Sequence, residues 1–307
     1  MTISKHLDKF FGLPVRNFSA GSELKAPIQA ACRVSCEDYD DSEGFSTVFA
    51  ELIADPLVSE IEALIVGCWD GGFEGGESTG AVEMLVSARD HFPKLRALFF
   101  GDIIYEESEI SWINQSDVSA IFSAYPKLEY LGIRGSNGLS LGSITHNSLK
   151  TLVIESGGLP AEVMKEIANA HLPNLEKLEL WLGDNEYGNS IDEETLKQLL
   201  YSNAFPQLKS LGLCNDAEAD TTAQIVAESE ILKRLETLDL SRGAIGDDGA
   251  KALIASPFIK FLKKLDVHHH YISDELTQQL QSLGIEVDTT EKMGDSDEEY
   301  RMITASE

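Results

Sequence analysis

One short pattern recurs along the chain: an aliphatic residue, two other residues, a leucine, one further residue and another apolar residue. It begins at eight positions: Ile61, Leu95, Leu128, Leu149, Leu175, Leu208, Leu235 and Leu262. The successive starts are 34, 33, 21, 26, 33, 27 and 27 residues apart. Self-similarity at such a period is the signature of a repeat architecture, in which similar units stack on one another. The chain is therefore predicted to be a stack of similar supersecondary units.

Each copy of the pattern predicts a strand, and most of the connecting segments predict a helix. Apolar residues that alternate with other residues indicate a half-buried strand. Residues 192–200, 247–254 and 273–280 have helical spacing, and Asp192 is a typical N-cap followed by acids in the first turn. The 21-residue spacing leaves no room for a helix, so we expect 135–147 to be a loop or a 3₁₀ turn. We predict an α/β solenoid, a horseshoe with a curved parallel sheet on the concave face and helices on the convex face.

The repeat over 235–255, LETLDLSRGAIGDDGAKALIA, resembles the ribonuclease-inhibitor class of leucine-rich repeats. That class places Asn or Cys three residues after the last apolar strand residue. The corresponding positions here are Trp69, Ile103, Ser136, Gly157, Gly183, Asp216, Gly243 and His270. Without such a ladder the turns need other hydrogen-bonding groups, and we expect His270 to supply them at its own turn.

A narrower resemblance covers 101–119, 155–160 and 178–188. These stretches are similar to an uncharacterised family of bacterial cytoplasmic leucine-rich-repeat proteins. That resemblance implies a fold and no activity.

Three regions follow from this pattern. Residues 1–27 are expected to form an N-terminal cap with a short helix near 5–11, and residues 28–287 the solenoid. From Glu286 onward the chain holds eight acids and two bases. We therefore expect 288–307 to be a disordered acidic tail.

The charge balance narrows the possible partners. The chain has 24 Lys and Arg against 52 Asp and Glu, a formal net charge of −28. Such a surface repels nucleic-acid phosphates and anionic lipids, so we expect neither a nucleic acid nor a membrane as partner. It favours a protein with a basic patch. Four cysteines are too few for a disulfide framework, and the sequence shows no signal peptide or spanning segment, so we expect a cytoplasmic protein.

No catalytic pattern has the context that its chemistry needs. The sequence G-x-S-x-G occurs at 138–142, but a nucleophile elbow requires a strand before it and a helix after it. We expect a protein that is not an enzyme and has no cofactor. A weaker alternative is a metal or small-ligand site formed by Asp239, Asp266 and His268, which the predicted strands place close together. Another is an accessory subunit of an enzyme encoded elsewhere.

The predicted function is protein binding through the concave face and its loops. Strand residues between the buried apolar positions point to that face. The candidates for partner binding are Phe99, Tyr130, Arg134, Glu155, Glu179, Trp181, Asp239 and Asp266. Trp181 is the leading anchor, unless the loop at 184–187 folds back and covers it. Trp112 is instead expected to hold its own loop against the solenoid.

Overall fold

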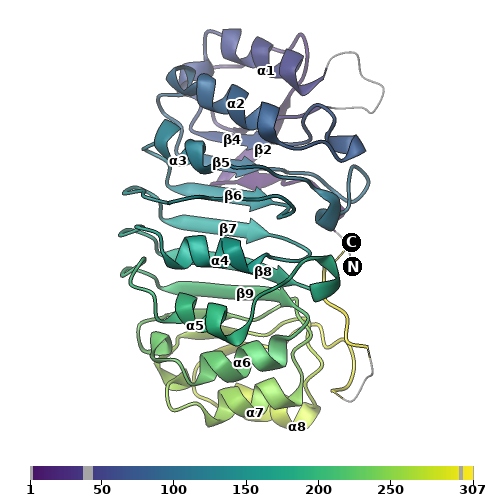
Figure 1. The fold of residues 1–307 in the computed structure, drawn as a ribbon, viewed down its shortest axis with the longest axis vertical. Helices are drawn as coiled ribbons and strands as arrows, with labels where there is room; N and C mark the ends of the chain where they lie inside the picture. The colour runs from purple at the N-terminus through teal and green to yellow at the C-terminus, as the bar shows by residue number, and fades with distance from the viewer. Residues whose placement is uncertain (1–2, 37–43, 297–299, 307) are drawn as a thin grey trace. The chain divides into compact units, whose positions relative to one another are not determined.

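The computed structural model describes residues 3–36, 44–296 and 300–306 (Figure 1). Within them the chain divides into two compact units, Thr2–Glu155 and Ser156–Ser306, called here the first and second unit. Each unit is a sheet with helices over one of its faces (Figure 1). The opposite face of each sheet is called its open face.

The described part of the first unit holds seven strands in chain order, of which β1 and β2 are antiparallel and the others parallel. The strands are β1 (Lys9–Phe10), β2 (Leu13–Phe18), β3 (Ala31–Val34), β4 (Ala63–Val66), β5 (Ala97–Phe100), β6 (Tyr130–Arg134) and β7 (Thr151–Glu155). Its α-helices are α1 (Phe45–Ala54), α2 (Thr79–Ser87) and α3 (Ser119–Ala124). Its 3₁₀ helices are η1 (Val58–Glu60), η2 (Gly72–Glu74), η3 (Arg89–His91) and η4 (Ile110–Trp112).

The second unit continues the same alternation with five parallel strands. The strands are β8 (Lys177–Gly183), β9 (Ser210–Asp216), β10 (Thr237–Asp239), β11 (Lys264–Asp266) and β12 (Glu286–Asp288). The α-helices are α4 (Ala161–Ala168), α5 (Glu193–Leu200), α6 (Ala219–Ala227), α7 (Asp247–Ala255) and α8 (Asp274–Gln281). The 3₁₀ helices are η5 (Asn185–Tyr187), η6 (Glu230–Lys233) and η7 (Ile259–Phe261).

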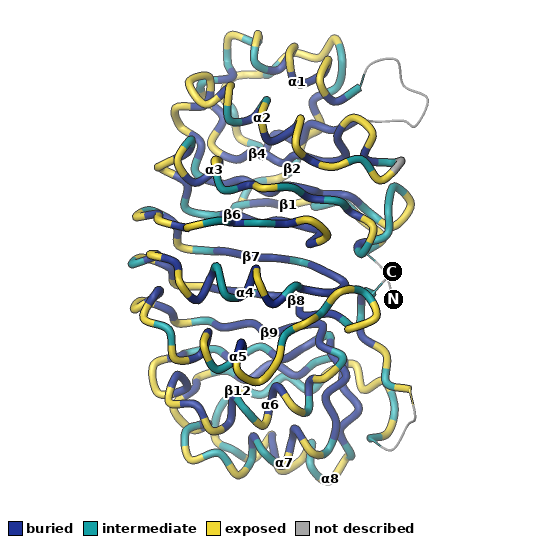
Figure 2. The backbone as a smooth tube through the Cα atoms, in the orientation of Figure 1, coloured by how far each residue is buried: buried dark blue, intermediate teal, exposed yellow. Residues whose placement is uncertain are grey.

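The strand register confirms the predicted repeat. Within each unit, the second leucine of a block lies beside the same leucine of the next block, as in Leu98 with Leu131 and Leu211 with Leu238. These leucines are fully buried, and Figure 2 shows strands such as β9 as largely buried segments. The segment between β6 and β7 has no helix, as the short spacing predicted. Asp192 caps α5 by accepting a hydrogen bond from the Thr195 amide at 2.8 Å.

The N-terminal segment differs from the expected helical cap. Residues 5–11 contain no helix, and β1 and β2 extend the sheet, with Val15 beside Ala31 of β3. Leu13 and Val15 alternate along β2 and pack against the apolar cluster on the open face. This period of two favours a strand, and the N-terminal segment therefore extends the sheet where a cap with a short helix was expected.

The expectation of a disordered tail is wrong for the described part of 288–307. Ile303 and Ala305 are buried, and Ala305 exchanges two hydrogen bonds with the side chain of Asn215. Arg301 forms an ion pair with Asp220 at 2.8 Å. The acidic composition misled the prediction because two apolar residues, Ile303 and Ala305, are enough to anchor the segment, although Met293, Tyr300 and Met302 are exposed. Residues 297–299 and 307 lie outside the described part.

Deleting residues 301–307 is expected to lower the free energy of unfolding by about 2–4 kcal/mol. The deletion removes the buried Ile303 side chain and leaves the buried Asn215 amide with only its longer hydrogen bond to the Ser156 carbonyl. Chemical denaturation of the full and shortened chains measures the effect. Equal stability of the two chains would restore the disordered-tail interpretation.

Candidate functional site

The open face of the first unit is covered by the chain's own N-terminal segment. Phe10 packs edge-on against Phe99 and Tyr130, with ring centroids 6.1 Å and 5.0 Å away. Phe99 is only 2% exposed, and Tyr130 is half-buried against the same cluster. The expectation of Phe99 as an exposed anchor is therefore wrong. A local sequence pattern predicts which way a strand residue points, but not which distant segment covers it.

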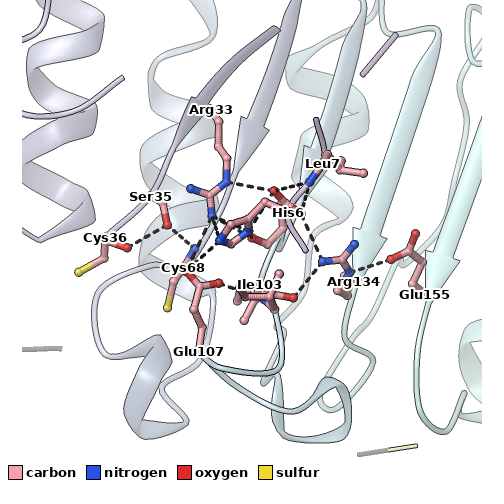
Figure 3. Close-up of polar contacts among 12 residues, drawn as sticks. His6, Leu7, Arg33, Ser35, Cys36, Cys68, Ile103, Glu107, Arg134 and Glu155 are labelled. Atoms are coloured by element: carbon pink, nitrogen blue, oxygen red, sulfur yellow. Dashed lines mark hydrogen bonds and ion pairs between the residues drawn. The ribbon is translucent and has the colours of Figure 1, made fainter. Parts of the chain in front are cut away.

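A buried ionic network lies next to this cluster (Figure 3). Asp102 lies just after β5 and is fully buried. Its carboxylate pairs with two arginines: Arg33 Nε lies 3.0 Å from Oδ2, and Arg134 Nη1 lies 3.2 Å from Oδ1. Arg134 Nε also contacts Glu155 Oε2 at 2.7 Å. The structure thus brings the candidates Arg134 and Glu155 together, but as an internal ion pair. Because Arg134 is buried, it is not available to a partner.

The network also holds the N-terminal segment in place. The Leu7 amide donates to the Asp102 carboxylate at 3.4 Å, and His6 Nδ1 lies 3.1 Å from the Asp102 carbonyl oxygen. Burial alone would raise the pKa of the Asp102 carboxyl, but His6 and the two guanidinium groups outweigh it and lower the pKa. Sequence reasoning missed Asp102 and Arg33. An arginine inside the apolar strand Ala31–Val34 was the available signal, because a buried guanidinium needs a carboxylate.

Trp181 on β8 is also buried, with 6% of its surface exposed. Its Nε1 donates to Glu179 Oε1 at 3.0 Å, and the Arg242 guanidinium lies over its ring, 5.3 Å from the centroid. Lys177 pairs with Glu179 at 2.8 Å. Burial works against ionisation of Glu179, but Lys177 and the indole N–H prevail and lower its pKa. The expectation that Trp181 is a free binding anchor is wrong, and its ring is contacted by Arg242.

Of the three residues predicted as a possible metal site, only Asp266 and His268 have ligand atoms close together. Asp239 lies beside Asp266 in the sheet, as expected. The group whose ligand atoms lie within 4.8 Å of one another consists of Asp266, His268 and Asp288, and it does not include Asp239. Asp266 is buried, and its carboxylate already contacts Lys264 Nζ at 3.0 Å and His268 Nδ1 at 2.7 Å. A metal ion would have to replace both of these contacts, so we assign none.

His270 supplies hydrogen-bonding groups to the backbone of the turn after β11, as predicted. Its Nε2 lies 3.0 Å from the Thr289 carbonyl oxygen, and its Nδ1 accepts a hydrogen bond from the Ile272 amide at 3.0 Å. Burial lowers the pKa of this imidazole. The histidine thus satisfies backbone groups where the ribonuclease-inhibitor class has asparagine.

Among the described residues of the first unit, the exposed large aromatic side chains lie in the loop of residues 101–114, called here the acidic loop. Trp112 is 62% exposed and Tyr105 is 44% exposed. The loop contains four acids and no Lys or Arg. Trp112 does not hold the loop, contrary to expectation, because the neighbouring Ile110 and Ile113 are buried and do so instead.

Parallel strands in repeat register, with helices on one face, define a leucine-rich-repeat protein. The chain is 35% identical to a Bacteroides fragilis protein whose crystal structure was solved by a structural genomics consortium. That match covers 91% of this chain and 78% of the other, with a TM-score of 0.80. The chain belongs to the same family as that protein, which is described without an activity.

Comparison with other known proteins indicates no activity. An internalin from Listeria monocytogenes is 14% identical over 76% of this chain and 68% of its own, with a TM-score of 0.34. That likeness is too weak to support an argument. No family model and no curated protein matches the chain. Among the described residues, no helix is both long and apolar enough to cross a bilayer.

Proposed function

We propose that this protein is a non-catalytic interaction module that binds a basic protein partner through the acidic loop. The observation that carries the proposal is the exposure of Trp112 in a loop without a basic residue. Tryptophan and tyrosine are enriched among the residues that dominate binding energy at interfaces. The large aromatic side chains of the strand faces, Phe99 and Trp181, are buried, whereas those of the acidic loop are accessible.

Charge supports a basic partner. Glu106 is exposed and Glu109 is half-buried in the same loop as Tyr105 and Trp112. The whole chain has a net charge of −28, which attracts a basic protein over a distance of about a Debye length. The aromatic residues would provide the contact area, and the acids would speed association.

The cysteines support a reducing compartment, which we propose to be the cytoplasm. All four thiols are free and buried. Burial raises the pKa of Cys32 and of Cys68 to about 12, so these thiols stay protonated and unreactive at neutral pH.

Trp112→Ala is expected to weaken partner binding by about 2 kcal/mol, or about 30-fold in Kd, without destabilising the fold by more than about 1 kcal/mol. The indole is exposed in the free protein, so its removal costs contacts only in the complex. Affinity purification from the native host identifies the partner, and calorimetry with the purified pair measures Kd.

Tyr201→Ala is the matched control, because Tyr201 is 61% exposed but lies in the second unit, after α5. It should leave Kd unchanged. Raising ionic strength should slow association more than it speeds dissociation. An unchanged affinity of Trp112→Ala would rule out the acidic loop, and salt-independent association would rule out a basic partner.

A further inference from the structure

A pocket of about 440 Å³ lies in the first unit, between β2, the start of β3 and the loop of residues 19–30, called here the cap loop. Four of its lining residues are large or apolar: Phe18 and Cys32 are buried, and Leu24 and Ile28 are half-buried. The volume lies within the roughly 300–1,000 Å³ of sites for small organic ligands. The pocket therefore has the room and the apolar surface for such a ligand.

The cap loop is held in place by two carboxylates of the neighbouring helix. The Gly21 amide donates to Glu51 Oε2 at 2.7 Å, and the Leu24 amide donates to Asp55 Oδ2 at 2.8 Å. Glu51 belongs to α1, and Asp55 follows its last residue. These hydrogen bonds fix the wall of the pocket before any ligand arrives, and they engage both carboxylates with backbone amides.

Two bases at the rim of the pocket have no acid as partner. Arg16 of β2 and Lys25 of the cap loop are exposed lining residues, and neither side chain has an ion pair or hydrogen bond within the described chain. Every other described arginine pairs with an acid, bonds to a carbonyl oxygen or lies over an aromatic ring. Glu23 is the one acid among the lining residues, so the lining has a net charge of +1.

This part of the chain has the opposite charge to the rest. Residues 1–30 contain four bases and two acids, a net charge of +2, whereas the remaining residues carry −30. Salt screens the distant acids beyond a Debye length of about 8–10 Å, so the charges at the rim dominate inside the pocket. The pocket therefore favours an anion, in contrast to the protein as a whole.

We propose that this pocket binds a carboxylate on an aliphatic stem, with the carboxylate on Arg16 and Lys25 and the stem against Leu24 and Ile28. The planar guanidinium group matches the two oxygens of a carboxylate. A single negative charge also matches the lining, whereas a phosphate group carries about −1.5 to −2 at neutral pH. The site shares no residue with the acidic loop and needs no protein partner.

Titration calorimetry of the full chain with octanoate, at neutral pH and constant ionic strength, tests the proposal. We expect one saturable site, weakened by about tenfold or more in Arg16→Gln, which removes the charge and the guanidinium fork. Arg89→Gln is the matched control, because Arg89 is an exposed arginine of the same unit that does not line the pocket. It should bind within about twofold of wild type.

Loss of binding in Arg16→Gln can be separated from loss of folding. The Arg16 side chain has no partner in the described chain, so the variant should unfold at the same urea concentration as wild type. Trp112→Ala should bind octanoate as wild type does, since Trp112 does not line the pocket. The fate of this proposal is therefore independent of the partner-binding one.

The stem and the head group are tested with shortened and neutral ligands. Octanoate should bind about tenfold or more tightly than butanoate, because its four additional methylene groups leave water. Octanamide, with the same stem and no charge, should bind about tenfold or more weakly than octanoate.

One further ligand distinguishes the sources of the carboxylate. Stronger binding of octanoate than of N-acetyl-leucine assigns the pocket to a fatty acid, and the reverse order assigns it to the C-terminus of a peptide. Absence of saturable binding by both carboxylates, equal binding by Arg16→Gln, or equal binding of octanamide would overturn the proposal. Arg16 would then be a charged residue that protects an edge strand from pairing.

Discussion

Replacing Asp102 by alanine is expected to lower the free energy of unfolding by about 3–5 kcal/mol, the usual effect of breaking a buried ion pair from one side. The substitution leaves two buried guanidinium groups, Arg33 and Arg134, without their shared carboxylate. Arg134 keeps Glu155 at 2.7 Å, whereas Arg33 keeps Glu107 only at 3.8 Å. Equilibrium denaturation with urea measures the loss.

Asp90→Ala is the control, because Asp90 is exposed in the same unit. It should change stability by less than about 0.5 kcal/mol. The pKa of Asp102 is lowered in the folded state, so its contribution is present above the pKa of the unfolded chain and is lost as pH falls through the folded value. The difference between wild type and Asp102→Ala should therefore shrink in acid. A loss near that of Asp90→Ala would show that the network adds little to stability.

Trp181→Ala is expected to cost about 3–5 kcal/mol of stability, as for other buried large aromatic residues. The substitution removes the indole beneath Arg242 and takes a hydrogen-bond donor from Glu179, which is itself largely buried. Thermal and chemical denaturation measure the effect.

Trp112→Ala is the matched comparison, since it removes the same side chain from an exposed position. The two variants should behave in opposite ways, with Trp181→Ala affecting folding and Trp112→Ala affecting partner binding. A Trp181→Ala protein as stable as wild type, but defective in binding, would return the anchor role to the open face of the second unit.

The repeat pattern predicted the fold because its determinants are local. Within each block the two leucines are three residues apart, and this local pattern specifies a strand. Asp192 specifies where α5 begins. Neither signal depends on a distant segment. The repeat pattern also predicted which strand residues lie beside one another, and the pairing of Asp239 with Asp266 confirms this.

The accessibility of the candidate residues could not be predicted in this way. It depends on segments that are far apart in sequence: His6 lies 96 residues from Asp102, and Asn215 lies 90 residues from Ala305. Neither segment belongs to a repeat, so neither carries the periodic signal.

The N-terminal segment on the open face of the first unit has a consequence for synthesis on the ribosome. His6 and Phe10 contact Asp102 and Tyr130, which are made 96 and 120 residues later in the chain. At about 5–20 residues per second, this interval lasts on the order of 10 s. During this interval the contacts of His6 with Asp102 and of Phe10 with Tyr130 cannot form, so this part of the apolar cluster is incompletely covered and open to nascent-chain chaperones.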